Sequence, residues 1–252
     1  MKKQTIMLAV LLAMSYSSIS SAGVLRDDKS DSDWEILLTP YLWGTSLDGT
    51  STIGMLPPLD IDASFGDILD NLNMALSMHT EFHRGKWAFV IDPMYVSLEI
   101  NLTSPIPDVS PKIEVDMLLV EAWTAYKINP NWELLGGIRW QDQDIAISPG
   151  LPAPPFPGTG FGVADDWLDW FAGARFNSPI GQKWIMTFRG DVVFAGDSDT
   201  SYNVEVFFNR RFGKNKALNL GYRYFVDDYD NLPTYAWDMK QQGPVIGYTW
   251  SF

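Results

Sequence analysis

Large apolar residues alternate with small or polar residues along most of this chain. Read back from the C-terminus, Phe252, Trp250, Tyr248 and Ile246 are large and apolar, and a small or polar residue stands between each pair. Successive side chains of a β-strand point to opposite faces, so a period of two predicts strands rather than helices. The same alternation runs through three internal segments, 86–95, 131–143 and 183–194.

The large aromatic residues stand at the ends of the expected strands, beside the short turns. A first set comprises Trp34, Phe82, Trp87, Tyr126, Trp132, Phe176, Trp184, Phe212 and Phe252. A second set follows roughly eight to ten residues further along, at Tyr95, Trp140, Phe194 and Tyr202. With the rise and tilt of barrel strands, this separation is about 19–23 Å along the membrane normal, close to the apolar band of an outer-membrane barrel. The two sets predict a transmembrane β-barrel.

The alternating segments predict a single antiparallel barrel of ten strands, since bacterial single-chain barrels have an even number. Eight or twelve strands are the alternatives. Short turns of such barrels face the periplasm and long loops face outward, which places both termini in the periplasm. Phe252 would then close the last strand beside the first, leaving no free sheet edge. The expected strands lie at approximately 34–46, 73–84, 86–100, 112–127, 131–146, 166–177, 182–195, 200–212, 216–229 and 239–252.

The first long loop, 47–72, carries a helix signal. Ser64 and Asp67 have the spacing of a capping box. The sequence therefore predicts a short helix in this outer loop, and two strands within 50–63, forming a hairpin above the membrane or raising the count to twelve, are the alternative. The expected helix has one apolar side, formed by Phe65, Ile68, Leu69 and Leu72.

Another long loop, 147–165, holds five prolines and four glycines. Such a composition predicts an extended and mobile segment. Its role does not follow from the sequence, but a surface-contact function for the barrel would use it.

The chain opens with the features of a secretory signal peptide. Lys2 and Lys3 precede an apolar run too short to span a bilayer, and small residues end at Ala22. The chain has no cysteine, so no disulfide framework supports it, and its net charge of −13 argues against nucleic acid as a partner. We expect a signal peptide at 1–22, a short periplasmic segment at 23–33 and a bacterial outer-membrane barrel at 34–252.

Several motifs resemble a broad family of small proteobacterial outer-membrane barrels, which is described mainly by architecture. The resemblance covers nearly the whole mature chain and implies fold and location, but no reaction. The terminal residues Tyr248, Trp250 and Phe252 also resemble the signal read by the barrel-assembly machinery of these membranes. The motifs include Pro40-Tyr41-Leu42-Trp43, Leu69-Asp70-Asn71-Leu72, Gly85-Lys86-Trp87, Gly137-Ile138-Arg139, Gly173-Ala174-Arg175, Arg189-Gly190-Asp191 and Gly221-Tyr222-Arg223-Tyr224.

If the aromatic face points outward, a set of charged residues points into the lumen. Isolated charges there would be unfavourable, whereas opposite charges on neighbouring strands can pair. Two interpretations follow: a structural ionic network that fills the barrel, or a charged constriction in a pore. The set, here called the belt, comprises Asp92, Glu121, Arg139, Asp169, Arg189, Asp191, Glu205 and Arg223.

His79, Glu81 and His83 share the inward face in the periplasmic half, beside Ser77. A zinc site or a Ser-His hydrolase are the chemistries to weigh. The two histidines are about 13 Å apart along a strand, so one ion cannot readily bind both. We therefore expect a hydrogen-bonding role, with no metal, no cofactor and no enzymatic activity.

Charge is also divided between the two ends of the expected barrel. Lysines and arginines gather in the periplasmic turns and aspartates in the outer loops, as in 227–230. An acidic mouth would concentrate cations, or would reach outer-membrane lipopolysaccharide through divalent cations. The expected function is a narrow or gated, cation-preferring pore for ions or small solutes. A non-conducting structural or surface-interaction barrel is the alternative, and an outer-membrane enzyme ranks last.

Overall fold

The computed structural model describes residues 33–101, 112–148 and 160–252, most of which lie in strands. The expected signal peptide, nearly all of the segment 23–33 and the Pro-rich part of loop 147–165 lie outside these residues. The elements are β1 (Glu35–Trp43), β2 (Ser46–Ile53), β3 (Leu59–Ala63), α2 (Phe65–Asp70), β4 (Leu72–Arg84), β5 (Trp87–Asn101), β6 (Lys112–Lys127), β7 (Trp132–Ser148), β8 (Phe161–Ile180), β9 (Trp184–Gly196), β10 (Ser198–Phe212), β11 (Lys216–Asn231) and β12 (Tyr235–Ser251).

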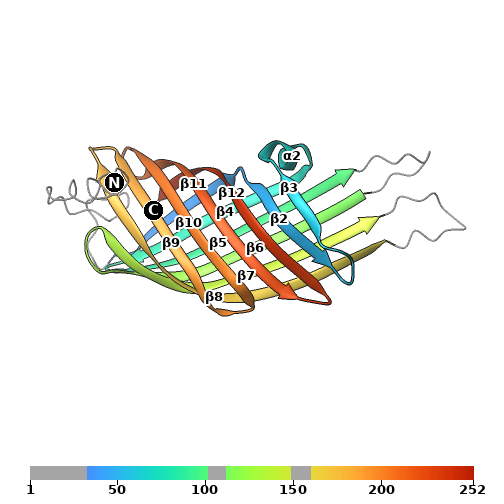
Figure 1. The fold of residues 1–252 in the computed structure, drawn as a ribbon. Helices are drawn as coiled ribbons and strands as arrows, with labels where there is room; N and C mark the ends of the chain where they lie inside the picture. The colour runs from blue at the N-terminus through green and yellow to red at the C-terminus, as the bar shows by residue number, and fades with distance from the viewer. Residues whose placement is uncertain (1–32, 102–111, 149–159) are drawn as a thin grey trace, which may run out of the picture.

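Ten of the strands form a closed antiparallel barrel, which confirms the predicted fold and strand number (Figure 1). Each strand from β4 to β12 pairs with the next along the chain, β1 pairs with β4, and β12 closes the wall against β1. At the closure Leu37 lies opposite Ser251, and the Phe252 N–H donates to the Ile36 carbonyl at 2.9 Å. The last residue is thus hydrogen-bonded into the wall.

The first outer loop contains both structures that the sequence offered as alternatives. After a break at Gly44 and Thr45, β2 continues along the outer half of β12, and β3 pairs with β2. The helix α2 follows, and its capping box is formed: the Ser64 hydroxyl accepts from the Asp67 N–H, and the Asp67 carboxylate accepts from the Ser64 N–H. The β2–β3 hairpin extends one side of the wall, so the sheet has twelve strands and the barrel ten.

The strands run further at their outer ends than the sequence predicts. β7 ends at Ser148, β8 begins at Phe161 and β12 begins at Tyr235. Above the membrane both faces of a strand meet water or loops, so hydrogen bonding continues although the apolar alternation fades. The end of the barrel that carries the short turns is called the periplasmic end, and the opposite end the outer end, after the orientation expected from the sequence. The turns at the periplasmic end are tight, and Gly85 and Gly213 take φ values of 59° and 68°, which a residue with a Cβ rarely adopts.

Side chains on the two faces of the wall differ as the alternation predicts. Outward positions carry large apolar residues left exposed by the isolated chain, and inward positions are buried. Within the described residues, no helix is long and apolar enough to cross a membrane. The exposed outward residues include Trp87, Ile91, Leu134, Trp170, Phe188, Phe194, Phe208, Leu220 and Ile246.

Candidate functional site: the barrel interior

Glu121 lies at the centre of an ionic network halfway along the barrel. Its Oε1 accepts from Arg139 Nε at 2.9 Å and from Arg223 Nη2 at 3.2 Å, and its Oε2 accepts from Arg189 Nη2 at 2.8 Å. Arg139 and Arg189 also lie 2.8 Å from the two carboxylate oxygens of Asp191. These five residues, the ionic network, come from the neighbouring strands β6 and β7 and from β9 and β11, which pair with neither of them.

Aromatic rings cover the faces of the central guanidinium group. Arg139 lies 4.9 Å from the ring centroid of Phe171 and 4.7 Å from that of Phe225. Arg139 is 0% exposed and Glu121 1% exposed. Charges at this depth need close partners, and here both hydrogen bonds and cation–π contacts supply them. The network therefore fills the middle of the barrel instead of lining an open channel.

Asp169 belongs to the predicted belt but has other partners. Its Oδ1 accepts from the backbone N–H groups of Asp197 and Ser198 at 3.0 and 2.9 Å, and its Oδ2 accepts from the Ser198 hydroxyl at 2.7 Å. Arg139 lies opposite it in register, but the ion pairs of the described residues do not join the two side chains. Asp169 instead fixes the short connection between β9 and β10.

A second cluster lies nearer the periplasm and contains His79, Glu81 and His83. Glu81 Oε2 lies 2.7 Å from His83 Nε2, and its Oε1 lies 2.9 Å from His79 Nε2. The other ring nitrogen of His79 lies 2.7 Å from Asp92, which also accepts from the Tyr41 hydroxyl at 2.9 Å. In the part of the chain that the structure covers, no group of three or more such side chains is arranged to hold a metal ion. The arrangement is that of a hydrogen-bonded chain.

Arg175 completes this cluster, although the sequence analysis did not assign it to the lumen. Its Nη1 and Nη2 donate to the two oxygens of Glu81 at 2.8 and 3.1 Å, and its Nε donates to Glu133 at 2.6 Å. Arg175 shares the parity of Asp169 on β8, so the alternation would have placed it inward. The sequence analysis named it only as part of the motif Gly173-Ala174-Arg175, near a short turn, and not as an inward charge.

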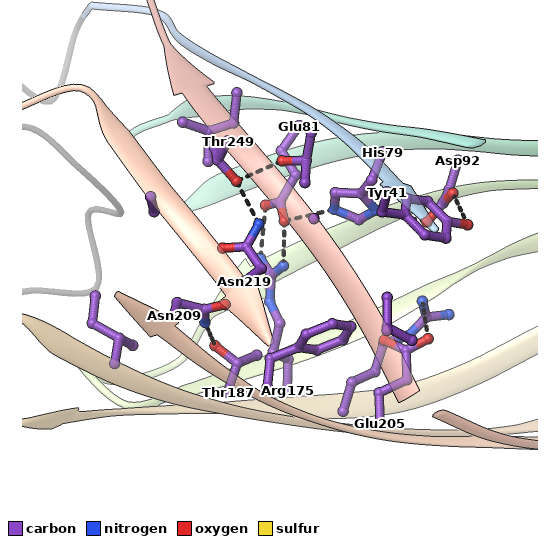
Figure 2. Close-up of a pocket in the computed structure, with 18 of the residues that line it drawn as sticks. Tyr41, His79, Glu81, Asp92, Arg175, Thr187, Glu205, Asn209, Asn219 and Thr249 are labelled. Atoms are coloured by element: carbon purple, nitrogen blue, oxygen red, sulfur yellow. Dashed lines mark hydrogen bonds and ion pairs between the residues drawn. The ribbon is translucent and has the colours of Figure 1, made fainter. Parts of the chain in front are cut away.

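On the periplasmic side of the ionic network the interior holds a cavity of about 160 Å³. Arg189, Glu205 and Arg223 form its inner end, and it extends to Arg211 and Ala217 beside the periplasmic turns. Figure 2 shows polar side chains projecting into it from strands on opposite sides of the wall. The periplasmic half of the barrel axis is therefore partly open.

Two chains of hydrogen bonds line this cavity (Figure 2). Asn209 donates to the Thr187 hydroxyl at 2.9 Å, and Thr187 donates to Asn177 at 2.8 Å. Across the cavity Asn219 donates to the Thr249 hydroxyl at 2.7 Å, and Thr249 lies 2.7 Å from Thr39 Oγ1. These neutral polar groups are paired with one another, and they share the cavity wall with charged side chains such as Glu81, Arg175 and Arg211.

On the outer side of the ionic network, large rings close the interior. Trp167 stacks on Tyr229 with ring centroids 4.4 Å apart, and the Tyr235 hydroxyl donates to Gln143 at 2.6 Å. Trp237 packs beside Tyr235 with centroids 6.4 Å apart. These rings, the aromatic layer, are almost fully buried together with Leu47, Ile68, Leu98, Ile145 and Met239.

The structure places all eight belt residues on the inward face, seven of them buried and Glu205 partly exposed. Tyr248, Trp250 and Phe252 lie on β12 or just after it, and the rings of Tyr248 and Trp250 pack edge to face at 4.7 Å. Their part in assembly remains a prediction.

No protein-family model matches this sequence, and no curated protein matches it. Solved structures with a similar fold include Ail, the attachment invasion locus protein of Yersinia pestis, in complex with the heparin analogue sucrose octasulfate (TM-score 0.41, 10% identity, 88% of this chain and 99% of that chain). Another is the translocator domain of the autotransporter NalP from Neisseria meningitidis (0.43, 11%, 99% and 98%). Neisserial surface protein A is also similar (0.34, 10%, 88% and 98%). At these identities and TM-scores the likeness carries no argument about the role of this chain.

Proposed function

We propose that this outer-membrane barrel is a gated, cation-preferring pore for ions or small solutes. The observation that carries the proposal is an excess of negative charge along the interior. A lumen with an excess of one sign favours counter-ions of the other sign. Eight buried carboxylates, Glu35, Glu81, Asp92, Glu121, Glu133, Asp169, Asp191 and Asp227, stand against four buried arginines, Arg139, Arg175, Arg189 and Arg223.

The location follows from the outward face. Its apolar side chains, such as Leu134 and Phe194, are exposed in the isolated chain, and a lipid environment would cover them. Pairing of each barrel strand with neighbours on both sides satisfies most backbone hydrogen bonds internally, as a bilayer requires. We place both termini in the periplasm, with cleavage of a signal peptide before insertion.

The interior supports gating more than constant flow. The cavity already opens the periplasmic half of the axis, so the remaining barrier consists of the ionic network and the aromatic layer. Ten strands give a lumen only somewhat wider than the eight-stranded case, which side chains can fill. Passage of an ion thus requires these side chains to move, and conduction should be small and intermittent.

Planar-bilayer recording of the refolded protein under a KCl gradient tests the proposal. We expect brief, small openings, far below those of a porin with 16 or more strands, and a reversal potential on the cation side. A reversal potential on the anion side would refute the selectivity argument. A large, steady conductance would show that the interior does not close the barrel.

A pair of tryptophans on β8 provides a matched test of the gate. Trp167 is buried in the aromatic layer, whereas Trp170 faces outward and is 52% exposed. Trp167→Ala should raise the frequency or size of openings without changing the sign of selectivity, and Trp170→Ala should leave conduction unchanged. Equal effects of the two substitutions would mean that the aromatic layer is not the gate.

A non-conducting structural barrel is the second candidate, and the burial of Glu121 among three arginines favours it. Such a network resists rearrangement, because any movement leaves charges unpaired. Silence of both the wild-type protein and Trp167→Ala over long recordings would support this candidate against the pore.

A further inference from the structure

The barrel wall is incompletely paired between β1 and β4, its first two strands in chain order. β1 and β4 are in register from Glu35 opposite His83 to Pro40 opposite Met78, and there their pairing ends. Ile36 exchanges backbone hydrogen bonds with Phe252 beside β12, so by alternation the backbone groups of Tyr41 and Trp43 face β4, where no register partner follows. Beyond this point β1 follows β12, with Tyr41 opposite Gly247, while β4 pairs with β5 alone. The two edges that part here, Tyr41–Trp43 and 72–77, are called the seam.

The seam lies at the outer boundary of the apolar band, with Leu42 inside the band and residues 72–75 of β4 beyond it. Leu42 follows Trp34, in the periplasmic aromatic set, by eight residues, which is about 18 Å along the membrane normal and inside an apolar band about 25 Å tall. In register, Leu76 lies opposite Tyr95 of the outer aromatic set. Backbone groups facing hydrocarbon without a partner are unfavourable, so a break in pairing at this depth needs something to cover it.

The helix α2 stands out from the wall near β3 (Figure 1), and two contacts connect its ends to strands on either side of the break. The Phe65 ring packs on Gly44, where an added Cβ would lie 3.1 Å from a ring atom. At the other end of α2, the Asn71 carbonyl accepts from the Glu99 N–H of β5 at 2.8 Å. Ile68, between them, is buried in the aromatic layer. The helix thus bridges from the β1–β2 break to β5.

The surface around the seam is apolar and joins the membrane-facing surface of the barrel. Leu42 is 59% exposed and Leu76 is 65% exposed. Phe65, Leu69 and Met74 are also exposed beside them. Because these side chains continue the apolar band of the outward face, what meets them in the membrane is the hydrocarbon part of a lipid.

We infer that the seam is a lateral site for one acyl chain of a membrane lipid, covered by α2. The chain lies between the unpaired edges of β1 and β4, with its end toward Ile68 and the aromatic layer. The site gives the interior an apolar approach from the membrane, independent of the axial path. The inference needs the barrel to lie in a membrane but does not need it to conduct.

Cysteine pairs test the separation of the two edges, since the chain has no cysteine of its own. Leu38→Cys with Thr80→Cys joins residues that are opposite in register. Leu42→Cys with Leu76→Cys joins residues that would be opposite if the same register continued four positions further. In lipid vesicles under mild oxidation we expect the first pair to form a disulfide at least tenfold faster than the second. Equal rates would show that the wall is closed and would overturn the inference.

A phospholipid with a photoactivatable group in its acyl chain identifies the occupant. Adducts mapped by mass spectrometry should appear on inward-facing residues of the seam, Ser77 and Tyr41, as well as on outward Leu76. In the paired part of the same strands, inward Leu37 should carry none while outward Phe82 does. Adducts confined to outward residues at both depths would refute the lipid site.

Water is the competing occupant. Ser77→Cys should resist a membrane-impermeant maleimide added to intact vesicles if an acyl chain fills the seam. Rapid reaction of this cysteine, together with a lack of lipid adducts at Ser77, would mean that the gap is hydrated and that the inference is wrong. A planar-bilayer result of either kind leaves these outcomes unchanged, so the pore proposal and this one can fail separately.

Discussion

A single carboxylate organises the middle of the barrel. Glu121 receives hydrogen bonds from three arginines, and each of those arginines has at least one further partner. Buried charges of this kind stabilise a structure only as a complete set, because removing one member leaves others unpaired. Replacing a single charged residue of the network should therefore lower the stability of the barrel far more than replacing a charged residue on the surface.

Arg139→Ala should therefore destabilise the barrel strongly. The substitution removes one of the three arginines that contact Glu121 and one of the two that contact Asp191, so these buried carboxylates share too little positive charge. Breaking a buried ion pair typically costs about 3–5 kcal/mol. The measurement is the temperature at which the folded protein loses its altered gel mobility in SDS. Lys183→Ala, on an exposed periplasmic turn, is the control and should leave that temperature unchanged. An unchanged temperature for Arg139→Ala would indicate a hydrated, wide lumen.

Strand parity predicted which residues face inward but not what they contact. All eight belt residues share the inward face because the alternation is regular along each strand. The partners of Asp169 lie on the β9–β10 connection, whose path depends on a turn that the alternation does not describe. The contact between Arg175 and Glu81 could not be predicted either. It crosses the barrel between β8 and β4, which are distant in the sheet.

At the scale of elements, α2 is the part of the molecule whose stability depends most on a local signal. It has six residues, and its capping box closes the first turn. Ser64→Ala should loosen the helix, because loss of an N-cap hydroxyl typically costs about 0.5–2 kcal/mol. A nitroxide on Leu69→Cys should then become more mobile in electron paramagnetic resonance spectra. Ser64→Thr keeps the hydroxyl and should not have this effect, and equal mobility in all three proteins would exclude a role for the cap.

Acidification should act in the same direction. Hydrogen bonds from the Ser64 hydroxyl and N–H lower the pKa of Asp67 from its ordinary value of 3.8. A depressed pKa in the folded state means that the stabilisation is present above the ordinary value and is lost as the pH falls through the folded one. The nitroxide on Leu69→Cys should therefore gain mobility only when the pH falls below the ordinary carboxyl pKa of 3.8. Asp67→Asn should remove this step, and a transition near neutral pH would point to a different group.

Element order also predicts which turns face which compartment. A cysteine at Leu232, in the turn between β11 and β12, should react with an impermeant reagent on intact cells. A cysteine at Asn215, in the turn between β10 and β11, should react only after the outer membrane is opened. The reverse pattern would invert the proposed orientation.

The number and order of strands could be predicted because lipid imposes a regular apolar face on each one. Their outer ends could not, since β8 and β12 continue where no lipid selects the side chains. The seam was also beyond prediction, because the register between β1 and β4 is a relation between strands and leaves no period in either sequence.

At the scale of the whole molecule, the pairing of β12 with β1 closes the ring of ten strands. The first and last strands must meet for this to occur, and Phe252 exchanges hydrogen bonds with Ile36 in both directions, at 2.9 and 3.3 Å. Deleting Phe252 should therefore reduce the fraction of protein that reaches the SDS-resistant form. Phe252→Tyr is the control, because it keeps an aromatic ring and both backbone hydrogen bonds to Ile36. Normal assembly of the Phe252 deletion would separate the C-terminus from this step.

The interior is filled in layers that involve the whole barrel, and the sequence predicted only the charged layer. The sequence indicated charges at mid-height, but not the aromatic layer, in which Trp167 of β8 reaches Tyr229 and Tyr235 on the paired strands β11 and β12, with which β8 does not pair. The cavity below it depends similarly on residues contributed by strands on opposite sides of the wall.

The first strand, β1, pairs with its neighbours over fewer positions than the strands of the long hairpins do. β1 has nine residues, and its register covers six positions against β4 and five against β12, whereas β11 and β12 match over sixteen. Unfolding of a ring must begin with a break somewhere, and the rate of that break is set by the fewest bonds that have to part together. The lifetime of the folded barrel is thus governed by the nine residues at its beginning, and the long hairpins that make up most of its surface would come apart only after them.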